Sequence, residues 1–175
     1  MITIQKPQEE DIRGVQEVYY KTWLSTYPNK EAGITKEDIE ERFKNHFSEE
    51  FVNKVKKASL NVPENELYLI AKDGMSVVGV CRAIKKENFN QLQSIYVLPE
   101  YQGRGIGGMF WKEIKEFFNN GEDIIIQVAT YNKQAISFYE KLGFVDNGKR
   151  LADERFKMPI SGALIPEMEM VLKFK

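Results

Sequence analysis

Residues 99–110 read PEYQGRGIGGMF, and four of the six residues from 103 to 108 are glycine. The stretch stands between a run of strand formers and a run of helix formers. Glycine lets the backbone approach a ligand closely, and the first N–H groups of a helix attract anions together with the positive end of its dipole. The stretch therefore suits a phosphate or pyrophosphate, or else it is a tight strand-to-helix turn that binds nothing.

A dinucleotide fingerprint is the first alternative for this loop. Gly103, Gly105 and Gly108 satisfy G-x-G-x-x-G, and Asp123 follows 20 residues after the first of them. Asp123, however, precedes the apolar run IIIQVA, so we expect it at the edge of the sheet opposite to the one where a ribose would lie. These features argue against NAD or FAD, and because no Gly-Lys-Ser or Gly-Lys-Thr follows, the P-loop pattern fails as well.

The hydrophobic pattern predicts the elements on either side of the loop. A capping box at Thr35 and Asp38, an N-cap at Ser48 and a hairpin turn at Asp73-Gly74 mark element boundaries. The expected strands are 2–5, the two arms of 66–86, 90–98, 123–129 and 166–174, and the expected helices start near residues 9, 36, 48, 106 and 133. The sequence therefore predicts a single α/β domain over residues 1–175, in which helices flank a mixed sheet.

Composition limits the classes of partner. The chain has 175 residues, 42% of them hydrophobic, with 25 basic and 26 acidic residues and a net charge of −1. This balance gives no electrostatic footprint for nucleic acid or an anionic membrane. The start of the chain lacks a signal-peptide pattern and no 18-residue apolar stretch occurs, so we expect a cytoplasmic protein. The single Cys81 lies in the apolar run VVGVC, where a buried structural thiol is the usual finding.

Two motifs together resemble the GNAT superfamily of acetyl-CoA-dependent N-acetyltransferases. Residues 102–107, QGRGIG, match Gln/Arg-x-x-Gly-x-Gly/Ala, and one helix and one strand later the chain reads NKQAISFYEKLGF. The two blocks cover residues 92–144 in the family's order and spacing. The resemblance implies a mostly antiparallel central sheet in which two parallel strands, 92–98 and 124–129, splay apart to hold the acyl arm.

The resemblance also implies which residues contact acetyl-CoA, the expected cosubstrate; no metal is implied. Backbone groups near Tyr96 and Val97 would pair with the pantetheine arm, and Asn132 would meet the arm or serve as a helix N-cap. The pyrophosphate would lie on the amides of Gln102, Gly103, Arg104, Gly105, Ile106 and Gly107.

Tyr139 matches the family tyrosine that protonates the leaving thiolate, although its place beside Phe138 and Leu142 also suits an ordinary core residue. A phenol with a pKa of about 10 can donate to a thiolate of similar basicity. The amine must also be neutral when it attacks. Forming the neutral amine from an alkylammonium at pH 7 costs about 4.6 kcal/mol, so a proton acceptor should help. Where part of the family has a glutamate base, this chain has Gln91, so we expect a water held by Gln91, Gln93 or backbone carbonyls. His46 is a weaker candidate, since a histidine on a helix face is usually packed or solvated.

The resemblance implies that the acceptor is a small-molecule amine or a protein amine, and the sequence leaves open a polyamine, an amino acid derivative, an aminoglycoside or a protein N-terminus. In this family the segments that correspond to 25–35 and 151–163 flank the acceptor, and Trp23 and Tyr27 could form the wall of the pocket or simply pack in the core. Acidic residues in these segments, Glu31, Asp153 and Glu154, could attract a cationic amine or could be solvated surface charge. A homodimer is compatible with the sequence but not specified by it. A non-catalytic acetyl-CoA binding or sensor module is the alternative to an enzyme.

Overall fold

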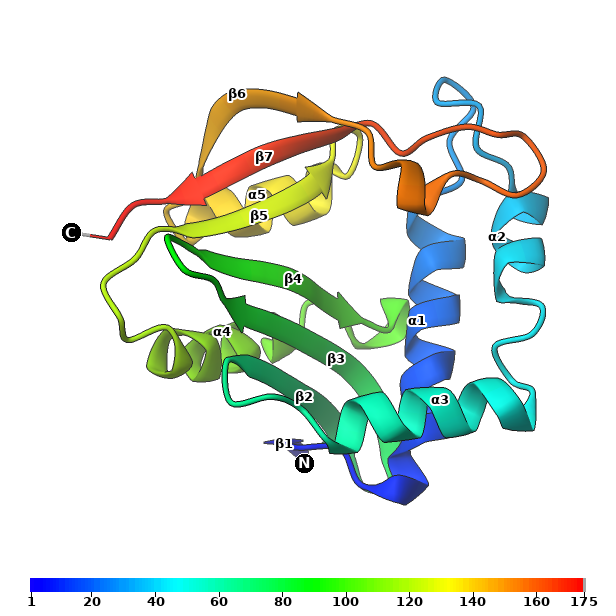
Figure 1. Ribbon diagram of the computed structural model, residues 1–175, viewed down its shortest axis with the longest axis horizontal. Coiled ribbons are helices and arrows are strands. Elements are labelled where there is room, and N and C mark those ends of the chain that lie inside the picture. Colours follow the sequence, from blue (N-terminus) through cyan, green and yellow to red (C-terminus); the bar gives the residue numbers. More distant parts are fainter. Residues whose placement is uncertain (175) are drawn as a thin grey trace.

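The computed structural model describes residues 1–174, which form a seven-stranded sheet with flanking helices (Figure 1). The order of the strands in the sheet is β1-β2-β3-β4-β5-β7-β6. The strands are β1 (Ile2–Gln5), β2 (Glu66–Asp73), β3 (Ser76–Lys85), β4 (Asn90–Val97), β5 (Ile124–Ala129), β6 (Val145–Leu151) and β7 (Glu167–Leu172). The α-helices are α1 (Ile12–Thr26), α2 (Lys36–Phe43), α3 (Glu49–Leu60), α4 (Ile106–Phe117) and α5 (Lys133–Lys141). Short 3-10 turns are η1 (Glu9–Asp11), η2 (Pro99–Tyr101) and η3 (Glu154–Phe156).

The local signals in the sequence start and end these elements as expected. The side chain of Thr35 accepts a hydrogen bond from the Asp38 N–H in a complete capping box, and Ser48 caps α3. Gly74 has a φ of +60° in the turn between β2 and β3. Phe47, expected on the apolar stripe of the second helix, lies beyond the end of α2 and is exposed.

One strand, β6, was not predicted. Its residues, VDNGKRL, are almost all exposed and carry no apolar alternation, which is the signal that a half-buried strand would give. β6 lies at the edge of the sheet and pairs only with β7. Its side chains are therefore exposed to solvent on both faces of the strand. The C-terminal part of the chain therefore contains one strand more than the sequence predicted, between α5 and β7.

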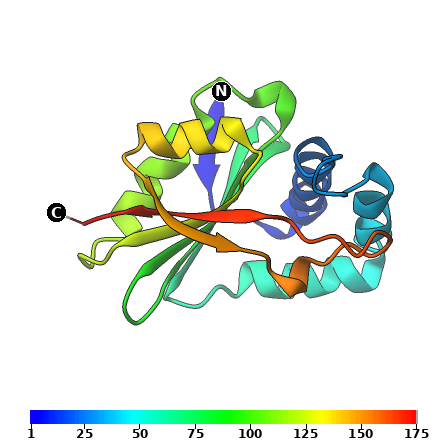
Figure 2. The ribbon, with the colours of Figure 1, turned by 90° about the horizontal axis from the view of Figure 1, so that it is seen from above.

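The sheet divides the helices into layers. Figure 2 shows α4 and α5 on one side of the sheet and α3 on the other, with α1 and α2 beyond one end. The main core lies between the sheet and the α4–α5 layer and includes Phe110, Ile114, Phe144 and Met170. A second cluster, around Trp23, Ile39 and Met158, packs α1 and α2 against the segment that precedes β7.

The feature that positions the site is a gap between β4 and β5. Both strands run parallel, but they pair only at Asn90 with Ile124 and at Gln91 with Ile125. Beyond these pairs β4 carries a β-bulge at Gln93, since Arg82 of β3 faces Ser94 and the next residue, Ala83, faces Leu92. A bulge bends its strand and increases the local twist, which directs β4 away from β5. The expected splayed pair and mostly antiparallel sheet are thereby confirmed.

Candidate active site

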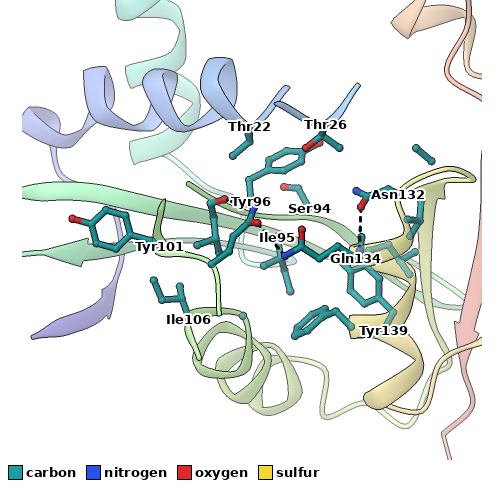
Figure 3. A pocket seen from close by; sticks show the side chains of 18 of the residues that line it. Thr22, Thr26, Ser94, Ile95, Tyr96, Tyr101, Ile106, Asn132, Gln134 and Tyr139 are labelled. Atoms are coloured by element: carbon teal, nitrogen blue, oxygen red, sulfur yellow. Dashed lines mark hydrogen bonds between the residues drawn. The ribbon is translucent and has the colours of Figure 1, made fainter. Parts of the chain in front are cut away.

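A cavity of about 310 Å³, here called the loop cavity, occupies the gap between β4 and β5. It extends from the glycine loop past the edges of both strands to the start of α5 (Figure 3). It is lined by residues 93–97, 101–103, 105–108 and 126–129, and by Thr22, Thr26, Tyr27, Asn132, Gln134, Ala135, Phe138 and Tyr139. The glycine loop and the block NKQAISFYEKLGF, which lie about 30 residues apart in the sequence, thus line the same cavity.

The glycine loop has the geometry expected of an anion site. Gly103 and Gly105 have φ values of +76° and +81°, and no protein atom lies within 4 Å of where a Cβ would stand at either position. Within residues 1–174, the N–H groups of Gly105, Ile106 and Gly107 donate no hydrogen bond to side chain or backbone. Open space, unpaired donors and a helix N-terminus therefore coincide at one end of the loop cavity.

Two residues of this loop have roles that the sequence did not indicate. A Cβ on Gly107 would stand 3.0 Å from the Phe138 ring, so this glycine lets α4 and α5 pack closely. The Arg104 guanidinium lies outside the cavity wall; it donates to the Glu100 carbonyl at 2.9 Å and stacks over the Tyr101 ring. Arg104 is therefore the one predicted residue of 102–107 that does not line the loop cavity.

Polar side chains link the loop to β4. The Gln102 amide donates to the Val97 carbonyl at 3.0 Å, and Gln134 donates to the Gln102 side-chain carbonyl, also at 3.0 Å. Gln134 was not predicted as a site residue; it stands one residue after the start of α5 and faces the same cavity. Asn132 accepts a hydrogen bond from the Ala135 N–H, which confirms its role as an N-cap, and it also lines the loop cavity (Figure 3).

Tyr139 is both a core residue and a cavity residue. It is 4% exposed, its ring packs edge-on against Phe138 and Phe144, and it lines the loop cavity. Its hydroxyl forms no hydrogen bond with any residue that the structure describes. Burial, aided by Cys81 and Tyr96, raises the pKa of the Tyr139 hydroxyl, so the phenol keeps its proton at neutral pH.

A second cavity, of about 500 Å³, adjoins the first and is here called the aromatic cavity. Its wall includes the expected residues Trp23, Gln91 and Gln93, and it shares Tyr27, Gln93, Ser94, Tyr96 and Gln127 with the loop cavity. Rings from α1, α2, α3, β2, β4 and η3 line it, namely Tyr19, Trp23, Tyr27, Phe43, Phe51, Tyr68, Tyr96 and Phe156. The two cavities therefore meet beside β4, at the tyrosines of α1 and β4.

Several candidates from the sequence are placed elsewhere or engaged. His46 lies in the wall of the aromatic cavity, with its ring between Phe43 and Phe51, and burial and Arg42 lower its pKa. Asp153 is paired with Arg155, while Glu31 and Glu154 are exposed. Cys81 is fully buried, as expected of a structural thiol, and burial raises its pKa.

Asp123 is at the opposite end of the sheet from the glycine loop. It precedes β5, where its carboxylate accepts hydrogen bonds from Lys173 and from the Phe174 N–H. The glycine loop follows the other end of β4, which runs parallel to β5. The dinucleotide reading of Gly103, Gly105 and Gly108 therefore lacks its ribose-binding acid.

No helix within residues 1–174 has the length and apolar character needed to cross a membrane.

A mixed sheet split between two parallel strands, with a glycine loop at the split, defines an acetyltransferase fold of the GNAT class. The family model described as Acetyltransferase (GNAT) family matches residues 20–144, and the chain belongs to this family. The family and the fold expected from the sequence are thus confirmed.

Three relatives illustrate the match. The chain is 37% identical over 90 residues to the uncharacterized protein YrkN of Bacillus subtilis, covering 49% of this chain and 48% of that protein. It is 34% identical over 92 residues to the N-alpha-acetyltransferase RimI of Mycobacterium tuberculosis, covering 50% of this chain and 57% of RimI. The chain thus spans about half the length of these curated relatives. The PaiA N-acetyltransferase of Thermoplasma acidophilum, solved in complex with coenzyme A, superimposes with a TM-score of 0.72 at 25% identity and 99% coverage of both chains.

Proposed function

We propose that this protein transfers an acetyl group from acetyl-CoA to a primary amine, either a small molecule or a protein N-terminus. The observation that carries the proposal is the continuity of the loop cavity, which joins the open amides of Gly105 to Gly107 with the Tyr139 hydroxyl. The coenzyme A complex of PaiA and the N-acetyltransferase names of PaiA and RimI support the same reading.

Each part of the loop cavity suits one part of acetyl-CoA. The pyrophosphate would accept hydrogen bonds from the loop amides, from Gln102 to Gly107, at the positive end of α4. The pantetheine arm would lie along β4 in the gap, pairing with backbone groups near Tyr96 and Val97 and passing Asn132. The Gln102 side chain, which holds the Val97 carbonyl at 3.0 Å, would yield that acceptor to the arm.

The chemistry is a direct attack of the amine on the thioester carbonyl. The nitrogen forms a bond to carbon, the carbon–sulfur bond breaks, and Tyr139 donates its proton to the departing thiolate. The buried phenol is protonated at neutral pH, so it starts each turnover in the form that a general acid requires. The aromatic cavity, which contains Trp23, Tyr27, Gln91 and Gln93, would receive the acceptor.

The experiment has a binding step and a turnover step. A ligand at a hundred times its dissociation constant adds about 2.7 kcal/mol, which raises the melting temperature of a chain of this size by several degrees. We expect this rise with acetyl-CoA and not with NAD. Thiol release in the presence of primary amines would then demonstrate transfer, whereas binding of acetyl-CoA without release for any amine would favour the non-catalytic binding module.

A further inference from the structure

Glu167 is the first residue of β7 and lies in the wall of the aromatic cavity. It pairs across the sheet with Ala129, which lines the loop cavity. Tyr27 and Tyr96 line the same cavity, and the negative charge of Glu167 adds to burial in raising the pKa of both hydroxyls. These tyrosines line both cavities, and Figure 1 shows the start of β7 at the end of the sheet near α1. Glu167 therefore stands beside the junction of the two cavities.

The other carboxylate in this wall is already engaged. Glu66 accepts from Arg82 at 2.6 Å. The carboxylate of Glu167, by contrast, forms no hydrogen bond and no ion pair with any of residues 1–174, although the residue is half-buried. A half-buried carboxylate without a partner is costly unless a ligand or solvent compensates it.

The arginines of the cavity leave this carboxylate unpaired. Arg82 is held by Glu66, and Arg155 is held by Asp153 at 2.5 Å. Arg42 donates to the carbonyls of Arg155 and Lys157, with its guanidinium 5.1 Å from the centre of the Trp23 ring. The cavity thus offers one free anionic group in a wall of aromatic rings.

The titratable groups that face Glu167 come from four segments. They are Asp153 and Arg155 of the η3 segment, Tyr27 at the end of α1, Tyr96 of β4, and Tyr131 between β5 and α5. Burial and the charge of Asp153 raise the pKa of Glu167, and Arg155 opposes them. The tyrosines are neutral near pH 7, with the pKa values of Tyr96 and Tyr131 raised to about 12. Glu167 is therefore a better proton acceptor than an exposed carboxylate would be.

We propose that Glu167 binds the ammonium group of the acceptor and accepts a proton from it, a role that rests on the proposed acetyl transfer. The ammonium loses one proton to Glu167, which releases it to water after turnover. The neutral nitrogen then bonds to the acetyl carbon as the carbon–sulfur bond breaks. The nitrogen then loses a second proton, which returns to Tyr139 and replaces the proton that Tyr139 gave to the thiolate. The products are therefore the amide, the free thiol and one proton.

The charges of the cavity also define the class of acceptor. One free carboxylate fits one positive charge, and the aromatic walls fit an apolar body next to it. A further positive charge on the same molecule would meet Arg42, which lines the cavity and forms no ion pair with residues 1–174. The acceptor is therefore a primary amine with a single positive charge and an apolar part, in preference to a polyamine.

The test compares Glu167→Gln with Glu169→Gln, using phenethylamine as the probe. Glu169 lies two residues along the same strand, pairs with Lys149 and lines neither cavity. Glu169→Gln therefore removes the same charge from a position outside the cavities. Calorimetric titration measures phenethylamine binding, and thiol release measures kcat/KM from pH 6 to 10. Acetyl-CoA titration and thermal melting confirm that each variant is folded.

In Glu167→Gln we expect phenethylamine binding to weaken at least tenfold and kcat/KM at pH 7 to fall about 100-fold or more. The deficit in kcat/KM should shrink as the pH rises toward the pKa of the amine, because free amine then forms in solution. Glu169→Gln should match the wild type in both assays. Spermidine should bind the wild type more weakly than phenethylamine does.

Wild-type binding and activity in Glu167→Gln would overturn the assignment of Glu167, as would failure of the wild type to bind phenethylamine when acetyl-CoA binds. Phenethylamine binding that depends on Glu167, with acetyl-CoA bound but no thiol released for any amine, would instead refute the acetyl transfer and leave Glu167 as the amine site.

Discussion

The hydroxyl groups of Tyr27 and Tyr96 lie 3.0 Å apart, at the point where the loop cavity and the aromatic cavity meet. Tyr27 comes from the C-terminal end of α1 and Tyr96 from the splayed part of β4, so the bond ties the first helix to the divided sheet. A third tyrosine, Tyr131, donates to the Tyr27 carbonyl at 2.9 Å. The boundary between the two cavities thus contains a hydrogen-bonded pair of tyrosine hydroxyl groups.

Replacing Tyr27 with phenylalanine should lower the free energy of unfolding by about 1 kcal/mol, because the Tyr96 hydroxyl loses its partner in a largely buried setting. Urea unfolding of the variant measures this difference. Tyr20→Phe is the matched control, since the Tyr20 hydroxyl forms no hydrogen bond with residues 1–174. Equal stability of the two variants would show that the bond between Tyr27 and Tyr96 contributes nothing.

Tyr139→Phe should reduce kcat by about 100-fold or more while leaving acetyl-CoA binding unchanged, because only the proton donor is removed from an otherwise apolar contact. Thiol-release assays and acetyl-CoA titration report the two effects separately. Since the pKa of Tyr139 is raised, the wild type should show no loss of activity from its deprotonation up to about pH 10. Full activity in Tyr139→Phe would remove this residue as the acid.

Two glycines of the loop should respond in opposite directions to alanine. Gly105 has a φ of +81°, so Gly105→Ala should destabilise the protein by about 1–2 kcal/mol even though open space surrounds the position. Gly108 lies inside α4 with ordinary backbone angles and no atom within 4 Å of a new Cβ, so Gly108→Ala should stabilise by about 0.5–1 kcal/mol. Thermal and urea unfolding measure both, and a stabilised Gly105→Ala would contradict the left-handed geometry.

Asp38 anchors the segment before β7 to the start of α2. Its carboxylate accepts from the N–H groups of Ile160 and Ser161 at 3.0 and 2.8 Å, and from Thr35. Burial alone would raise the pKa of Asp38, but these hydrogen bonds outweigh it and hold the pKa at about 2. Asp38→Asn should cost about 1–2 kcal/mol, because an amide N–H₂ would face the Thr35 N–H.

The pH dependence of stability provides the check on Asp38. Its folded-state pKa is below the unfolded value, so the unfolded chain binds more protons between about pH 4 and pH 2. The stabilisation is complete above pH 4 and declines as the pH falls through this window. Urea unfolding at pH 3 and pH 6 should therefore show a smaller difference between wild type and Asp38→Asn at pH 3. The same difference at both pH values would mean that folding leaves the pKa of Asp38 unchanged.

Much of the fold was predictable because its signals are local. The capping box at Thr35, the Asp73-Gly74 turn, the glycine loop and the apolar stripes of α4 and α5 each act within a few residues. The edge strand β6 was not predictable in this way, since its exposed residues carry no apolar alternation and it forms only by pairing with β7.

For the candidate site, the sequence by itself indicated motif residues that line the loop cavity, because their spacing reflects one loop and one helix. They are Gln102, Gly103, Gly105, Ile106, Gly107, Asn132 and Tyr139. Only the tertiary structure decided that Arg104 points away, that Gln134 joins the loop cavity, and that Glu167 stands unpaired beside Tyr27 and Tyr96. Those facts depend on the bulge at Gln93, on strand register and on which charges find partners. Several of these contacts join residues far apart in the sequence, such as Tyr27 with Tyr131, so no local pattern in the chain records them.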